Sequence, residues 1–131
     1  MLWRGVAVFL AAALVALLQG CATEPGRRIQ ALFAPSKGEV ALNAGLKQYE
    51  DGDYSDSARN LSSAINQGLS DSERVTAHKH LAFIHCASGR ERQCRDEFRK
   101  ALSVEPGLEL APAEAGHPTW GPIFRSLKAG R

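Results

Sequence analysis

The 131-residue sequence has little net charge, because 16 Lys and Arg residues against 14 Asp and Glu residues leave a formal charge of +2. So small an excess of positive charge argues against nucleic acid as a partner. The sequence also has no low-complexity stretch. We therefore interpret the scattered charges as the solvated surface of one small folded domain.

Motifs for catalysis and metal binding are missing as well. There is no Gly-x-Ser-x-Gly motif, and none of the four histidines has another four residues away, the spacing that places two imidazoles on one face of a helix. His78 and His85 lie seven residues apart, about 10 Å along a helix. We predict no enzyme activity, metal or cofactor, with His78 and His85 packed between helices and His80 exposed. An envelope enzyme with an unrecognised site is kept as an alternative.

The apolar run Val6–Leu18 is too short to span a membrane comfortably. It follows Arg4 and has the length of a signal-peptide apolar segment. The next residues, Leu18-Gln19-Gly20-Cys21, resemble the lipobox of bacterial lipoproteins, in which an aliphatic residue lies three positions before the cysteine and a small residue directly before it.

This resemblance implies that residues 1–20 are cleaved and that the thiolate of Cys21, a soft nucleophile, accepts a diacylglyceryl group. Several acyl chains hold a protein firmly on a membrane. Because Ala22 follows the cysteine, the resemblance further implies the outer membrane, with the domain facing the periplasm. Residues 21–35 are predicted to form the lipidated N-terminus and a tether. The alternative is an ordinary signal peptide cut elsewhere.

From residue 36 to residue 106 the apolar spacing is helical, and it predicts an all-α fold of two helical hairpins. Both hairpins begin with a capping-box pattern, Ser36-x-x-Glu39 and Ser70-x-x-Glu73. The predicted breaks within the hairpins are at Gly52 and Gly89, 37 residues apart, so the pattern is an internal repeat. The repeats are expected at about 36–69 and 70–106.

The repeat resembles the tetratricopeptide (TPR) repeat, whose period is about 34 residues. Small residues occupy the positions at which TPR helices approach closely, and larger apolar residues occupy the positions between them. The small residues are Gly45, Ala82, Ser57, Cys94, Ala64 and Ala101; the larger ones are Leu61 and Phe98; and Pro106 takes the place of the terminal proline. His78 departs from the pattern at a position that is usually aromatic.

Two repeats form a thin stack, and repeat arrays usually need about three units. We therefore expect residues 107–131 to cap the stack with a short helix that includes Ile123, Phe124 and Leu127. Trp120 is predicted to fill the core, with a role as an anchor for a partner as the alternative.

Two cysteines remain besides Cys21. Cys86 and Cys94 lie symmetrically about the predicted turn at Arg90, in a chain expected to reach a compartment where disulfides persist. We predict that they form a disulfide; the alternative is two small core residues without a bond.

By resemblance to the TPR family, the first helix of each repeat would line a concave groove. Apolar groove residues would suit a partner helix or an extended peptide. The predicted lining residues are Leu42, Leu46, Tyr49, Glu50, Lys79 and Phe83. The alternative is that the C-terminal tail folds back and fills the groove.

The C-terminal half resembles small TPR lipoproteins associated with type VI secretion, the TssQ-like group. The resemblance lies in two stretches, His85-Cys86-x3-Arg90-x-Arg92-Gln93-Cys94-Arg95-Asp96-Glu97-Phe98 and Pro112-Ala113-Glu114-Ala115-Gly116-His117-Pro118-x-Trp120-Gly121-Pro122. It implies an accessory scaffold that supports a secretion machine of the cell envelope through contacts with protein partners. The alternative is a TPR lipoprotein of another outer-membrane system, such as a pilus-pilot or barrel-assembly factor.

Overall fold

The computed structural model describes residues 32–130, and all regular elements in this range are helices. In chain order they are α3 (Lys37–Glu50), α4 (Tyr54–Gln67), α5 (Asp71–Ala87), α6 (Glu91–Val104), α7 (Pro112–Ala115) and α8 (Gly121–Ala129). The all-α, TPR-like fold of two helical hairpins with a short C-terminal helix is therefore confirmed. The predicted signal peptide and most of the predicted tether lie outside the described residues.

The helices begin and end where the sequence provides local signals. At the start of α3, the Ser36 hydroxyl accepts a hydrogen bond from the Glu39 backbone N–H (3.1 Å), and the Glu39 carboxylate accepts one from the Ser36 backbone N–H (2.6 Å). A reciprocal pair of the same kind, Ser70 and Glu73, begins α5. Such pairs satisfy backbone N–H groups that have no partner within the helix.

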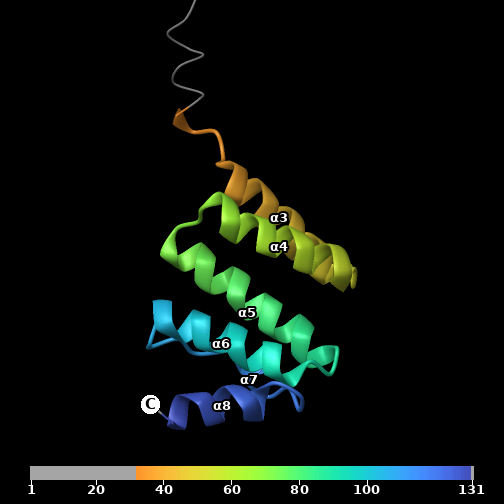
Figure 1. Ribbon diagram of the computed structural model, residues 1–131, viewed down its shortest axis with the longest axis vertical. Helices are drawn as coiled ribbons and strands as arrows, with labels where there is room; N and C mark the ends of the chain where they lie inside the picture. Colours follow the sequence, from red (N-terminus) through yellow and green to blue (C-terminus); the bar gives the residue numbers. More distant parts are fainter. Residues whose placement is uncertain (1–31, 131) are drawn as a thin grey trace, which may run out of the picture. The chain divides into compact units, whose positions relative to one another are not determined.

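Within each hairpin a glycine reverses the chain. Gly52 between α3 and α4 has φ = 81°, and Gly89 between α5 and α6 has φ = 72°. A residue without a Cβ adopts this left-handed conformation at little cost. The two predicted breaks thus have the same backbone geometry, and both lead to an antiparallel helix pair (Figure 1).

The paired helices approach closely at small residues. The Ser57 hydroxyl is buried and donates to the Gly45 carbonyl oxygen (2.7 Å), and a Cβ added to Gly45 would lie 2.9 Å from two side-chain carbons of Leu61. In the second hairpin, Ala82 and Cys94 take the equivalent places, and both are fully buried. The small residues therefore set the distance between the helices.

Two groups of buried side chains form the core. One lies between α3, α4 and the adjoining side of α5 and is centred on Leu61 and Ala64. The other joins α5 and α6 to α8 and is centred on Phe83, Phe98 and Phe124. Figure 1 shows the resulting order, in which the first hairpin, the second hairpin and α8 follow one another along the stack. The helix α8 is thus the C-terminal cap that the sequence predicts.

The contact at Gly45 yields a prediction. Gly45→Val should lower the free energy of unfolding by about 1–3 kcal/mol, because the new side chain must push α3 away from α4. The measurement is urea denaturation of the soluble chain lacking residues 1–21, followed by circular dichroism. Asn43→Val is the control, since it adds the same side chain at an exposed position of α3. Equal stability of the two variants would contradict this role of Gly45.

Candidate functional site: the inner face of the stack

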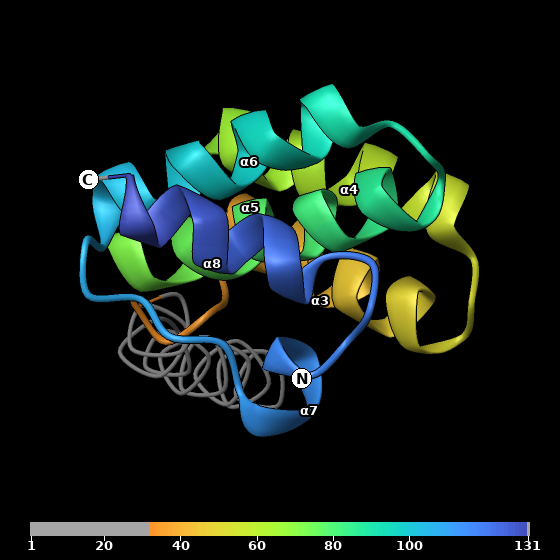
Figure 2. The same ribbon diagram turned by 90° about the horizontal axis from the view of Figure 1, so that it is seen from below.

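The inner face of the stack is the side formed by the first helix of each repeat, α3 and α5. Figure 2 shows α7 on the same side as these two helices, opposite α4 and α6. The six residues predicted to line a groove all belong to α3 and α5. Their surroundings therefore decide how much of this face is open to a partner.

The structure corrects the prediction for two of the six residues. Leu42 is only 5% exposed, because it packs into the core between α3, α4 and α5. Phe83 is 2% exposed, because the C-terminal segment covers it. Leu46, Tyr49 and Lys79 are half-buried, and Glu50 is exposed. Apolar character alone therefore did not identify which of these side chains face solvent.

Residues 107–120, which we call the strap, cover the inner face of the second repeat. The indole of Trp120 stacks on the Phe83 ring, with ring centroids 4.6 Å apart, and its Nε1–H donates to the Glu114 carbonyl oxygen (2.9 Å). Leu108 and Leu110 are buried in the same core group. Trp120 is thus a core residue. At the second repeat, the C-terminal tail fills the predicted groove, as the alternative interpretation of the sequence expects.

An ion pair fastens the strap to α5. The Lys79 ammonium donates to both carboxylate oxygens of Glu114 (2.8 and 3.2 Å), and both side chains are half-buried. Burial alone would raise the pKa of Glu114, but the bonds from Lys79 and from the Ala111 backbone N–H outweigh it, so the pKa lies below its ordinary value. Glu114 is therefore held as a carboxylate that closes the strap over α5.

A row of aromatic rings crosses the inner face from the first repeat to the second. Tyr49 contacts Tyr54 (ring centroids 5.5 Å apart), His80 (5.0 Å) and Phe83 (6.4 Å). Burial raises the pKa of Tyr49, which keeps its hydroxyl protonated. At the first-repeat end of the row, Tyr54 is 45% exposed. The exposed end of this aromatic row is therefore at the first repeat.

The prediction that His80 is exposed is wrong. Its ring packs between Tyr49 and Phe83, and its Nδ1–H donates to the Thr76 carbonyl oxygen (2.8 Å). Burial lowers the pKa of His80, so the imidazole is neutral at neutral pH. Helical spacing did place His80 away from His78, but it gave no sign that Tyr49 of the neighbouring repeat covers it.

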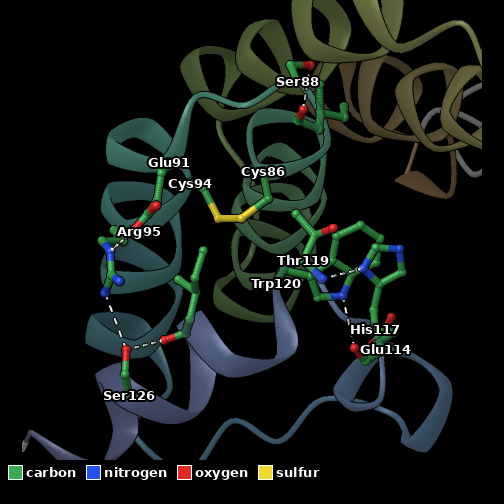
Figure 3. Close-up of a disulfide and its surroundings, with 12 residues drawn as sticks. Cys86, Ser88, Glu91, Cys94, Arg95, Glu114, His117, Thr119, Trp120 and Ser126 are labelled. Atoms are coloured by element: carbon green, nitrogen blue, oxygen red, sulfur yellow. Dashed lines mark hydrogen bonds and ion pairs between the residues drawn. A yellow bond between two sulfur atoms is a disulfide. The ribbon is translucent and has the colours of Figure 1, made fainter.

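Cys86 and Cys94 are joined by a disulfide that ties the end of α5 to the start of α6, with Cα atoms 5.1 Å apart (Figure 3). Both residues are buried, and they belong to the core group that contains Phe83 and Trp120. The bond therefore fixes the part of α5 on which the strap rests.

A second buried polar cluster lies between α5 and α6. The Glu97 carboxylate contacts His78 Nδ1 (2.6 Å) and accepts from the Lys100 ammonium (2.6 Å). Burial alone would raise the pKa of Glu97, but these two partners lower it below its ordinary value. Among residues 32–130, no three His, Cys, Asp or Glu side chains are grouped so as to hold a metal ion. The cluster acts as a contact between two helices.

The remaining predicted site residue, Cys21, lies outside the described residues. In the part of the chain that the structure describes, no helix combines the length and the apolar character needed to cross a membrane.

Comparisons with known proteins give two similar relatives, while no protein-family model and no solved structure matches the chain. The photosystem I assembly protein Ycf3 of Synechococcus sp. (strain CC9605) is 28% identical over 86 residues, which are 64% of this chain and 50% of that protein. The protein of the same name from Synechococcus sp. (strain CC9902) is 29% identical over 67 residues, 51% of this chain and 39% of its own length.

This chain thus spans half or less of the length of the curated relatives it matches. Both relatives are named as assembly proteins and neither is named as an enzyme. The TPR-like fold and this similarity together indicate a helical-repeat module for protein interaction.

The disulfide gives the second prediction. In the soluble chain, Cys86→Ala/Cys94→Ala should lower the free energy of unfolding by about 2–3 kcal/mol, because the bond restricts the unfolded chain. The measurement is urea denaturation followed by the fluorescence of Trp120, the only tryptophan after residue 3. A thiol assay on unreduced, denatured protein should find no free thiol. Two free thiols in that assay would contradict the bond.

The ion pair between Lys79 and Glu114 gives the third prediction. Lys79→Met keeps an unbranched side chain at this position and removes the charge, so the free energy of unfolding at pH 7 should fall by about 1 kcal/mol. The folded-state pKa of Glu114 lies below its ordinary value of 4.5. The contribution of the ion pair to the free energy of unfolding is therefore fully present above pH 4.5. It is lost as the pH falls through the folded-state pKa of Glu114.

Urea denaturation at a series of pH values between 7 and 3 should thus show the difference between wild type and Lys79→Met narrowing below pH 4.5. Lys47→Met is the control, because it removes a fully exposed ion pair with Asp51 and should cause no measurable change. A difference that stays constant with pH would contradict the assignment to Glu114.

Proposed function

We propose that this protein is a lipid-anchored accessory scaffold of the bacterial cell envelope, held on the outer membrane through Cys21 and facing the periplasm. Its partner would be a component of a type VI secretion system. The anchor is supported by Arg4, the apolar run Val6–Leu18 and the sequence Leu18-Gln19-Gly20-Cys21. The secretion system is supported by the resemblance of the second repeat and the strap to the TssQ-like lipoproteins.

One observation carries the scaffold role: the inner face keeps partly exposed apolar side chains at the first repeat. The strap closes the second-repeat half through Trp120 and Glu114. The first-repeat half presents Leu46 and Tyr49, beside the exposed Tyr54 at the start of α4. Half-buried aliphatic and aromatic side chains of this kind suit the side chains of a partner protein.

The chemistry of the described residues favours binding over catalysis. The polar side chains that lie close together, Lys79 with Glu114 and His78 with Glu97, bond to each other across helices. Each pair therefore joins two elements of the fold. The two relatives named as assembly proteins favour the same role and extend it to the assembly of protein complexes in general.

The test begins with the anchor. In the cells that make it, tagged full-length protein should sediment with membranes, and Cys21→Ala should move it to the soluble fraction, because the thiolate that takes the lipid is gone. Cys86→Ala/Cys94→Ala is the matched control, since it also replaces cysteine by alanine and should leave the protein on the membrane. Sedimentation of Cys21→Ala with the membranes would contradict lipidation at this residue.

The partner is tested in the same cells by chemical crosslinking and mass spectrometry. Membrane-complex or baseplate proteins of a type VI system should be enriched over the Cys21→Ala control. Enrichment of pilus or barrel-assembly proteins would instead assign the scaffold to another outer-membrane system. If the crosslinked proteins were instead enzymes of small-molecule metabolism, the result would count against the scaffold role.

A further inference from the structure

The two repeats differ in how many sides of their first helix are buried. Besides the side that faces its own hairpin partner, α5 buries a second stripe against α4 of the preceding repeat. This stripe consists of Ala77, Leu81 and Ile84, none of which is more than 4% exposed. They pack with Leu61 and Ala64 of α4. The stripe is therefore the surface through which one repeat stacks on another.

The equivalent stripe of α3 is open to solvent. The repeat offset of 37 residues, which relates Gly52 to Gly89, places Val40 and Ala44 where α5 has Ala77 and Leu81, and it places Lys47 where α5 has Ile84. Val40 is 55% exposed, and Ala44 is exposed as well. The sequence thus keeps apolar side chains at two stacking positions that no preceding repeat covers within residues 32–130.

These residues form part of a pocket of about 380 Å³ at the first-hairpin end of the stack. We call this surface the end face. It has an apolar stripe from α3, a polar border from α4, and Pro35 and Lys37 at the start of α3. The remaining lining residues are Val40, Ala41, Ala44, Asn60, Ser63 and Gln67. Its apolar part corresponds in position to two of the three residues through which α5 stacks on α4.

The other end of the stack is closed by α8. Phe124 contacts Phe98 of α6 (ring centroids 5.1 Å apart), and Ile123 and Leu127 pack on the same core group. The outward side of α6 is thus covered in the way that α5 covers α4. The second helix of each repeat is therefore covered: α4 by α5, and α6 by α8. A second copy of this chain thus has no free second helix, among its described residues, that could pack on α3 in the same way.

We propose that the end face docks an amphipathic helix of a different protein, which packs on α3 as α4 packs on α5. This inference rests on the proposed scaffold function. The model for the docked helix is α4 itself, whose side toward α5 carries Ala58, Leu61 and Ile65. The partner helix accordingly has small and aliphatic residues at spacings of three and four, no charge at the centre of that stripe, and polar residues beside Asn60 and Gln67.

The experiment uses the full-length protein in the cells that make it. Val40 is replaced by the photoreactive residue p-benzoylphenylalanine, the cells are irradiated, and the crosslinked peptides are identified by mass spectrometry. Ala44→Glu, added to this protein, places a charge at the centre of the apolar stripe and should lower the crosslinking yield about tenfold or more. Ala113→Glu is the matched control, because Ala113 is exposed on α7, and it should leave the yield unchanged.

Crosslinks to one partner protein, within a helical segment that has the stated stripe and with the stated loss in Ala44→Glu, would support the proposal. Crosslinks to residues 22–34 of the same chain, crosslinks to a second copy, or a yield that Ala44→Glu leaves unchanged would each overturn it. Circular dichroism of the soluble chain with Ala44→Glu should show unchanged folding, because Ala44 is exposed.

Co-purification separates this inference from the scaffold function on which it rests. If secretion components co-purify with wild type and with Ala44→Glu equally, the end face is not the docking surface, although the scaffold function stands. If no envelope component co-purifies with wild type, the scaffold function itself fails.

Discussion

The stacking of Trp120 on Phe83 is the contact on which the rest of this small structure depends. Two helical hairpins bury little apolar surface, and the core around Phe83 and Phe98 is completed by side chains from beyond the second repeat. Trp120 lies directly before α8, so its packing brings Phe124 onto α6 and holds the strap across α5. The same contact therefore completes the core and closes half of the inner face.

The disulfide and the ion pair act on the same region of α5. Cys86 and Cys94 fix the end of this helix to α6, and Lys79 holds the strap at Glu114. The first repeat has no disulfide, since Tyr49 and Ser57 occupy the places of the two cysteines, and it has no ion pair to the strap, since Leu42 occupies the place of Lys79. Covalent and ionic contacts are thus concentrated in the repeat whose inner face is closed, and the repeat with the open inner face relies on packing around Leu61.

The local features of the fold were predictable from the sequence, because each depends on residues close together in the chain. The capping boxes at Ser36 and Ser70 and the turns at Gly52 and Gly89 are of this kind. The burial of Phe83, the pairing of Lys79 with Glu114 and the covering of His80 were not predictable. They depend on contacts between a repeat and either the strap or the other repeat, and the strap has no periodic pattern that would reveal its path.

The closure of one end of the stack by α8 limits how complexes of this protein grow. Repeat modules that are open at both ends add further units in series, as β-strands do at the edges of a sheet, and such addition leads to fibres. Here the side of α6 that would receive the next unit is occupied by Phe124 of the same chain. Within the described residues, a further repeat therefore cannot stack on α6 as α5 stacks on α4, which limits growth of the stack at that end.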